Sequence, residues 1–413
     1  MSVEVVTFGC RLNGLESEAI RRRAGAEGLD AVVVHTCAVT AEAGRQARQA
    51  IRRLKREAPG RALVVTGCGV EVEPALYAAM PEVDHVVGNG DKLKPEPWRG
   101  IAAGTAARRV AAAAGEGGTP PLEGFPGRTR GFVQVQGGCD HACTFCIIPK
   151  GRGPSRSLPV PEVVAGAGIL AAAGYQELVL TGVDIASWGR DGGRLGDLVA
   201  ALLDAVPGVP RLRLSSLDPA AIDPTLEDLL ATHPRLMPHV HLSLQAGDDL
   251  VLKRMRRRHR RAEALALCAR LRARRPGIAF GADLIAGFPT EDEAMFGRSL
   301  ALVEEAGLAF LHVFPYSPRP GTPASRMPQV EKAIRKERAA RLRAAGRVVL
   351  DRLLLGEVGR VRPVLVERGG GGHTPAFAFV RLSDADAAAL AGTIQDVQVT
   401  GTGDGCLTGR VLR

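Results

Sequence analysis

Short β-branched runs alternate with helix-forming segments along most of this chain, and this alternation restricts its fold more than any other feature. Three runs lie in the first seventy residues, at Val3–Phe8, Ala31–His35 and Ala62–Thr66. Each is too short to be a helix and is rich in residues that favour strands. Helical spacing fills residues 15–27 and 41–57 between them. Such a series forms parallel strands joined by crossover helices, so the chain begins with an α/β unit.

The 413 residues leave room for about two to four domains. We expect the first to be a doubly wound α/β domain over residues 1–105, with a fourth strand near residues 85–88. Residues 106–128 are rich in Ala, Gly and Pro, a composition that predicts a linker.

A second and longer β/α series follows, and we expect residues 129–352 to form a central domain. Strands are predicted there at residues 132–136, 177–181, 211–215, 239–244, 278–284 and 308–314. Six β/α units predict an open, partial (β/α)6 version of the TIM barrel, whose active site lies at the carboxyl ends of the strands. Residues 353–413 carry short strands and glycine-rich turns that predict a small all-β barrel, with Gly369–Gly372 as a hairpin tip.

The chain has an excess of positive charge, with 54 Lys and Arg against 44 Asp and Glu. This excess suits a polyanionic partner such as nucleic acid, although alone it is weak support. No apolar run approaches the roughly 18 residues of a membrane-spanning helix, and the first residues lead into a strand rather than a signal peptide. We therefore expect a cytoplasmic protein with no membrane partner.

Three clustered cysteines carry the strongest chemical signal. Cys139, Cys143 and Cys146 form a Cys-x3-Cys-x2-Cys run just after the first strand of the central series. Cytoplasmic cysteines are more often ligands or catalysts than disulfides. Structural zinc sites and ferredoxin clusters both take four protein ligands, and no fourth cysteine lies nearby. Three thiolates on a four-iron cluster would leave one iron open to a small molecule, and a zinc knuckle that recruits His141 is the alternative.

This run is similar to that of the radical S-adenosylmethionine (SAM) enzymes, in which the open iron binds the amino and carboxylate groups of the methionine part of SAM. The resemblance continues at the ends of three predicted strands, in Leu180–Asp184, His241–Gly247 and Asp283–Pro289. Without the cysteines, ordinary turn chemistry would explain these segments. The resemblance implies SAM-binding roles for Phe145, Thr181, Gly182, Ser243, Gln245, Arg257, Asp283 and Gly287.

Three further cysteines, Cys10, Cys37 and Cys68, each follow a predicted strand within two residues. The carboxyl ends of parallel strands lie along one edge of a sheet, where α/β folds bind ligands. The three thiolates can therefore converge although they are 27 and 31 residues apart. A buried structural role is the ordinary interpretation of one such cysteine. Three at the same topological position predict a second three-cysteine cluster.

Across nearly its whole length the chain resembles the methylthiotransferases. The matching segments are Phe8–Asn13, Thr36–Thr40, Thr66–Cys68, Cys139–Cys146, Met255–Arg258 and Phe314–Thr322. Within the family, the first of these segments and Cys146–Ser157 look most like the MtaB type, which methylthiolates N6-threonylcarbamoyladenosine beside the tRNA anticodon. The terminal β-rich segment looks like the TRAM domain, an RNA-binding barrel.

The resemblance implies two 4Fe-4S clusters, SAM, and a radical reaction at C2 of adenine. The cluster on Cys139, Cys143 and Cys146 would reduce SAM, and the resulting deoxyadenosyl radical would abstract hydrogen from C2. The cluster on the other three cysteines would carry the sulfur, methylated by another SAM. The implied partners are the anticodon stem-loop of a tRNA and an external electron donor, and the sulfur donor stays open.

Alternatives remain at this point. Relatives that methylthiolate a ribosomal-protein aspartate usually have Pro-Lys-Asn where this chain has Arg11-Leu12-Asn13. Isopentenyladenosine in tRNA is another substrate, and a non-catalytic iron–sulfur or zinc RNA-binding protein belongs to a different class. The chain also has His35 where the family commonly has Asn, which leaves the polarity of the first-domain pocket undecided.

The segment Lys253–Arg261 is strongly basic, with seven Lys or Arg in nine residues. A solvated helix face is the ordinary explanation, yet the planar fork of arginine also suits phosphate. Because aromatic residues make up only 4% of the chain, we expect a footprint on backbone phosphates with one extruded base. RNA contacts are predicted for Lys253, Arg254, Arg256, Arg258, Arg260 and Arg261.

Overall fold

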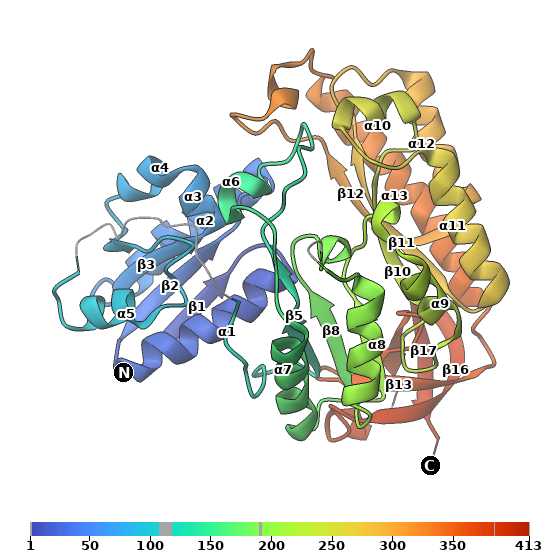
Figure 1. Cartoon of the computed structure of the whole chain (residues 1–413), viewed down its shortest axis with the longest axis horizontal. Coiled ribbons are helices and arrows are strands. Elements are labelled where there is room, and N and C mark those ends of the chain that lie inside the picture. Colours follow the sequence, from blue (N-terminus) through green and yellow to red (C-terminus); the bar gives the residue numbers. More distant parts are fainter. Residues whose placement is uncertain (1, 107–117, 190–191, 384, 413) are drawn as a thin grey trace.

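The computed structural model describes residues 2–106, 118–189, 192–383 and 385–412. Three bodies follow one another along the chain, as Figure 1 shows: an N-terminal α/β layer, a central β/α body and a C-terminal barrel beneath it. No helix in the described ranges is long and apolar enough to cross a membrane.

The N-terminal body is a four-stranded parallel sheet in the order β1–β2–β3–β4. Its strands are β1 (Val3–Thr7), β2 (Ala31–Thr36), β3 (Ala62–Gly67) and β4 (His85–Val86). Its helices are α1 (Arg11–Ala26), α2 (Ala41–Glu57), α3 (Cys68–Val72), α4 (Pro74–Ala78) and α5 (Pro95–Ala102). Side chains alternate across each strand, so Val33 packs with α1 and α5 whereas Val34 packs with α2 and α4. Helices therefore cover both faces, which confirms the predicted α/β fold.

The central body consists of two three-stranded parallel sheets, β5–β8–β9 and β10–β11–β12. Two isolated parallel bridges connect them, from Leu212 of β9 to Leu236 and from Leu217 to Leu242 of β10. The strands are β5 (Arg130–Gln134), β8 (Glu177–Thr181), β9 (Arg211–Leu214), β10 (His239–Gln245), β11 (Ala279–Ala286) and β12 (Leu308–Pro315). All six strands predicted for the partial barrel are present. A short pair, β6 (Gln136–Gly137) and β7 (Arg156–Ser157), flanks the segment that carries the clustered cysteines.

Helices pack on the outside of these strands and leave an inner face that the strands share. They are α7 (Val160–Ala172), α8 (Leu195–Ala205), α9 (Pro224–Thr232), α11 (Arg261–Arg274), α12 (Glu293–Glu305) and α13 (Lys332–Leu355), with shorter α6 (Ile148–Arg152) and α10 (Asp249–Met255). On β10, Leu242 and Leu244 belong to the core beneath the helices. Strand alternation therefore directs His241 and Ser243 to the inner face.

The last body is a closed barrel in the order β13–β14–β15–β17–β16. Its strands are β13 (Val361–Glu367), β14 (Gly371–His373), β15 (Phe379–Leu382), β16 (Ile394–Gly403) and β17 (Cys406–Val411). The predicted glycine tip is only half correct, because the turn covers residues 368–370 and Gly371 and Gly372 belong to β14. A side chain at Gly372 would collide with the carbonyl oxygen of Leu365 on the paired strand.

The C-terminal barrel closes the lower end of the central body. Arg211 of β9 donates to the carbonyl oxygens of Pro363 (2.7 Å) and His373 (3.1 Å). Phe377 stacks on His239 of β10 with the ring centroids 4.7 Å apart.

The predicted linker is partly outside the described residues, which omit 107–117. Its described remainder, residues 118–128, is packed against the central body. Leu122 and Phe125 are buried in the main core, and the backbone N–H of Phe125 donates to the hydroxyl of Tyr175 (2.6 Å).

Candidate functional site

The three N-terminal cysteines lie at the carboxyl edge of the parallel sheet. Cys10 precedes α1, Cys37 directly follows β2, and Cys68 begins α3 after β3. Gly9, with φ of +104°, lets the segment before Cys10 pass close to Cys37. A side chain at Gly9 would come within 2.9 Å of the Cys37 Sγ. The structure therefore places Cys10, Cys37 and Cys68 at one edge of the sheet.

Burial controls the chemistry of these thiols. Cys10 is exposed, whereas Cys37 and Cys68 are buried. Burial raises the pKa of Cys37 to about 11, although the backbone N–H of Val39 donates to its sulfur (3.5 Å) and opposes the rise. Burial also raises the pKa of Cys68. A metal that binds here must displace protons from both thiols.

A tight loop positions the central cysteines. Gly138, with φ of +69°, turns the chain beside Pro154, and the N–H of Cys139 donates to the carbonyl of Gly153 (3.1 Å). The N–H of Thr144 donates to the carbonyl of Met255 at the end of α10 (3.1 Å). Both bonds hold the loop at the mouth of the central body.

Arg257 contacts this loop. Its guanidinium donates to the Cys143 Sγ (3.6 Å) and to the Ser243 carbonyl (2.7 Å), and lies 3.3 Å from Asp218. Burial raises the pKa of Cys139 to about 11 and that of Cys146 to about 12. Burial thus favours the neutral thiol at Cys139 and Cys146, as it does at Cys37 and Cys68.

The spacing of the sulfurs separates two kinds of metal site. Two thiolates on one tetrahedral zinc ion, with bonds of about 2.3 Å, lie about 3.8 Å apart. Among the described residues, no three cysteine sulfurs gather within 4.8 Å of one another. The three sulfurs of each set are therefore not arranged as three ligands of one zinc ion. Cys139, His141 and Asp184 do offer ligand atoms within 4.8 Å of one another, so the predicted zinc alternative at His141 has a geometric basis. The His141 Nε2 lies 2.7 Å from the Asp184 carboxylate.

Four of the residues predicted to hold SAM lie at the carboxyl ends of two strands, at the mouth of the central body. Thr181 ends β8 and Gly182 follows it, while Ser243 and Gln245 lie in the last three residues of β10. Phe145 packs edge-on against Phe288, with the centroids 6.5 Å apart.

Two of the predicted residues lie apart from this group. Asp283 lies on β11, with its carboxylate 3.2 Å from both His241 and His312. Gly287, with φ of +70°, lies beneath Arg335 of α13, where a side chain would collide with that arginine.

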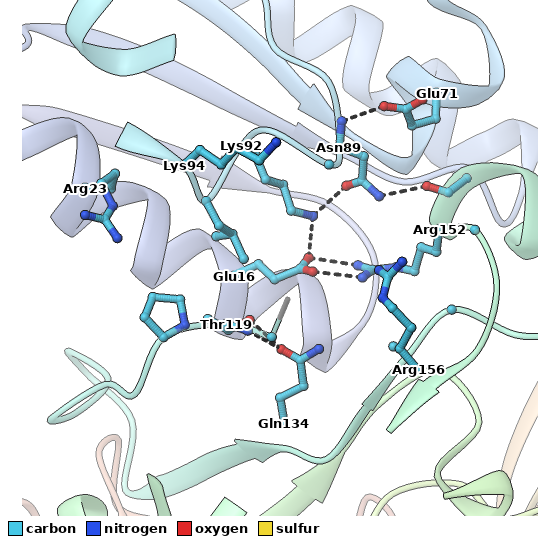
Figure 2. A pocket seen from close by; sticks show the side chains of 18 of the residues that line it. Glu16, Arg23, Glu71, Asn89, Lys92, Lys94, Thr119, Gln134, Arg152 and Arg156 are labelled. Atoms are coloured by element: carbon cyan, nitrogen blue, oxygen red, sulfur yellow. Dashed lines mark hydrogen bonds and ion pairs between the residues drawn. The ribbon is translucent and has the colours of Figure 1, made fainter. Parts of the chain in front are cut away.

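A buried charge network that the sequence analysis missed joins the two cysteine sites. Glu16 of α1 accepts from Arg152 of α6 through two bonds of 2.8 Å and from Lys92 (2.7 Å). Figure 2 shows this carboxylate between the two cations, in the wall of a pocket of about 340 Å³. Burial alone would raise the pKa of Glu16, but the charges of Arg152 and Lys92 outweigh it and hold the pKa below its usual range. Of these three charged residues, only Arg152 lies in a segment that resembles the family motif. No local sequence pattern therefore predicted the network.

The same network accounts for His35. Its Nδ1 lies 2.8 Å from the Ser17 hydroxyl and its Nε2 lies 3.3 Å from the Lys92 ammonium. Burial and the Lys92 charge hold the pKa of His35 well below its usual range, so the ring is neutral. His35, where the family commonly has Asn, is therefore also an uncharged polar side chain.

Helix α6 lies directly against α3 and links the cysteine sites in space. Asn89, after β4, donates to the Gly151 carbonyl (2.7 Å). A side chain at Gly151 would come within 3.2 Å of the Cys68 Cβ. The chain that leaves Cys146 thus packs onto the segment that contains Cys68.

Protein-family models match the N-terminal and the central body of the chain. A model of the radical SAM superfamily matches residues 133–303, and a model described as uncharacterized protein family UPF0004 matches residues 2–88. The chain is 46% identical to the threonylcarbamoyladenosine tRNA methylthiotransferase MtaB of Rickettsia prowazekii (strain Madrid E), over 92% of this chain and 91% of that protein. This chain belongs to the radical SAM methylthiotransferase family.

Other relatives agree with this membership. The methylthiotransferase is 37% identical to MtaB of Bacillus subtilis (strain 168), over 81% of this chain and 78% of that one. It is 36% identical to the tRNA-2-methylthio-N(6)-dimethylallyladenosine synthase of Anaeromyxobacter dehalogenans (strain 2CP-C), over 98% of this chain and 93% of that protein. The radical SAM methyltransferase TsrM of Kitasatospora setae shares the fold, with a TM-score of 0.54 at 16% identity over 79% of this chain and 74% of that chain.

The basic segment of this methylthiotransferase divides into exposed and engaged cations. Lys253, Arg256 and Arg260 are exposed at the junction of α10 and α11. Arg258 is also exposed in part, and it pairs with Asp218 (3.1 Å).

The other two predicted RNA contacts are bonded within the chain. Arg254 donates to the Thr290 carbonyl (3.1 Å), and Arg261 pairs with Glu305 (2.7 Å). Both side chains therefore already contribute to the fold of the central body.

Proposed function

We propose that this methylthiotransferase adds a methylthio group to C2 of N6-threonylcarbamoyladenosine beside the anticodon of a tRNA. The observation that carries the proposal is the pair of three-cysteine sites on adjoining bodies, joined by α6 and the Glu16–Arg152 pair. The substrate follows the printed activity of the most similar of the relatives described above.

The six cysteines are the proposed ligands of two 4Fe-4S clusters. Cys139, Cys143 and Cys146 would hold one, and the three N-terminal cysteines would hold the other. When bound, these clusters and SAM supply the radical that breaks the inert C2–H bond and the sulfur that replaces the hydrogen. Such chemistry lies beyond ordinary side-chain acids and bases.

The chain's own residues bind, orient and exclude water. We infer that Phe145, Thr181, Gly182, Ser243 and Gln245, at the mouth, contact SAM, with Arg257 fixing the cysteine loop. Asp283 and Gly287 are assigned to the same cofactor, with Asp283 at the lower edge of its site. Phe377 and Arg211 close the floor of the central body, which keeps water from the reacting base.

The proposed working units keep the predicted bounds. Residues 1–105 hold the sulfur-bearing cluster, 129–352 hold the SAM-binding cluster, and 353–413 form a TRAM-like RNA-binding barrel, with 106–128 as the connection. We propose Lys253, Arg256, Arg258 and Arg260 as phosphate contacts for the anticodon stem-loop. Arg254 and Arg261 would add to the local positive potential. The electron donor is an external protein or reductant.

Nucleoside mass spectrometry tests this function. The protein is reconstituted with iron and sulfide without oxygen, then incubated with SAM, dithionite and a stem-loop RNA that carries N6-threonylcarbamoyladenosine. We expect the 2-methylthio derivative of that nucleoside, and no such product from the same RNA with unmodified adenosine. Product only from an RNA carrying dimethylallyladenosine would contradict the assignment.

A further inference from the structure

Charged side chains fill the inner face of the central body, and most are already paired. Arg213 of β9 donates to both carboxylate oxygens of Glu177 on β8 (2.8 and 3.2 Å). Arg130 of β5 lies 3.1 Å from Glu367 of the C-terminal barrel. These pairs occupy the lower level, where the barrel closes the floor.

The middle level is also satisfied internally. Asp283 lies 3.2 Å from His241 and 3.2 Å from His312, and these side chains hold the pKa of Asp283 below its usual range against the effect of burial. Glu177, Glu367 and Asp283 thus each have a cationic or histidine partner.

Arg11 is the exception. It is the first residue of α1, directly after Cys10, and its side chain is exposed to solvent. One turn further along α1, Leu15 is buried in the core of the central body together with Phe132 and Leu178. Because residues four apart lie on the same helix face, the Arg11 side chain also faces the central body. Its charge there interacts with Glu177 and Asp283. No hydrogen bond or ion pair joins it to any residue in the described part of the chain.

An unpaired guanidinium in such a position selects an anionic ligand group. Its planar fork donates two parallel bonds to a carboxylate. A threonylcarbamoyl substituent ends in a carboxylate, whereas a dimethylallyl substituent is wholly apolar. A site built to hydrogen-bond a polar group rejects an analogue that lacks it, because the site's own group is then left unpaired.

We propose that Arg11 binds the carboxylate of the threonylcarbamoyl group and so selects this base over bases with an uncharged N6 substituent. The inference rests on the proposed function and adds a specificity-determining residue to it. Arg11 directly follows Cys10 and begins the helix that packs on the central body, so it would hold the N6 substituent of the base where the N-terminal and central bodies meet.

Two RNAs and two variants test the proposal. One stem-loop carries N6-threonylcarbamoyladenosine, and the other carries the same substituent with hydrogen in place of the carboxylate. Arg11→Gln removes the charge, and Arg21→Gln removes an arginine from the same helix that pairs with Glu18. Equilibrium binding and kcat/KM are measured for both RNAs, with iron content and circular dichroism as folding controls.

The wild type and Arg21→Gln should prefer the carboxylate RNA by about 10- to 100-fold, the factor expected of a hydrogen-bonded charge pair. Arg11→Gln should lose that preference, mainly through KM, and bind the two RNAs within about threefold of each other. Arg11→Lys should restore part of it.

Full discrimination by Arg11→Gln would overturn the proposal. Equal weakening on both RNAs, with a salt slope reduced by about one, would assign Arg11 to a backbone phosphate instead and would also overturn it. Wild-type protein that discriminates in binding but forms no methylthio product would refute the proposed function while leaving the role of Arg11 intact.

Discussion

Glu16 shows how much of this molecule depends on a single buried residue. Its carboxylate joins α1 to α6 through Arg152 and to the loop after β4 through Lys92. Removing one partner from such a buried network typically costs about 3–5 kcal/mol, because a charge is left without compensation. The neutral ring of His35 belongs to the same cluster, so the network should respond to acid in two steps.

The first step concerns His35. Its pKa lies well below the usual 6.5 in the folded protein. The unfolded chain therefore binds a proton that the folded protein excludes as pH falls below about 6.5, and stability falls by up to about 1.4 kcal/mol per pH unit. Glu16, whose folded pKa lies below 4.5, adds a further loss only below about pH 4.5.

We predict that His35→Gln reduces the pH dependence of stability between pH 6.5 and 5. Glutamine keeps an uncharged polar side chain and does not titrate, so one proton is removed from the linkage. Melting temperatures followed by circular dichroism at several pH values provide the measurement. Parallel curves for the wild type and the variant would contradict this assignment, and measurements at pH 7.5 establish any pH-independent cost.

At the scale of elements, the junction of α10 and α11 is the surface on which the RNA proposal depends. Lys253, Arg256 and Arg260 project from it without burial, while Arg257 beside them is turned inward to Cys143. The run of identical charges in the sequence gives no sign of this division. It arises because Arg256, at φ of +58°, ends α10 in a left-handed conformation and redirects the following residues.

Replacing Lys253, Arg256 and Arg260 together by Gln should weaken stem-loop binding and flatten its salt dependence. Each phosphate contact contributes about 0.7–0.9 to the slope of log affinity against log salt, so the slope should fall by about 2–3. A matched control replaces Arg270, Arg274 and Arg352, exposed arginines that pair with acidic residues on the outer helices. An equal change of slope in both triple variants would show that only net charge matters.

The strands were the most predictable elements. The six strands of the central body begin and end within about two residues of their predicted positions, since β-branched runs bounded by turn residues specify strands locally. The short α6 and α10 were not predicted. Gly and Pro interrupt α6, which is held by its contact with α3 rather than by its own propensity.

At the scale of the whole molecule, the sequence predicted which cysteines belong to each site, but not the contacts that join the two sites. Topology alone takes Cys10, Cys37 and Cys68 to one sheet edge, because parallel strands end together. The approach of Arg152 to Glu16, separated by 136 residues, depends on the packing of two bodies. No periodicity or spacing encodes such a contact, and the position of Arg11 facing the central body was hidden for the same reason.

This packing also affects how the cysteine sites should be tested. The bodies share a buried interface, so a buried ligand such as Cys37 is a poor choice for substitution. Cys10 is exposed and its removal disturbs packing least. Cys143 is the matched position in the other set, where substitution removes the hydrogen bond from Arg257.

Product analysis of Cys10→Ala tests the central claim of two sites with separate tasks most directly. Under dithionite, this variant should still cleave SAM to deoxyadenosine but form no methylthio nucleoside, whereas Cys143→Ala should form neither. Each variant should retain about four of the eight irons of the wild type, if each site holds a four-iron cluster. The account predicts deoxyadenosine without methylthiolation from Cys10→Ala. Loss of deoxyadenosine from both variants, with fold and the remaining irons intact, would contradict it.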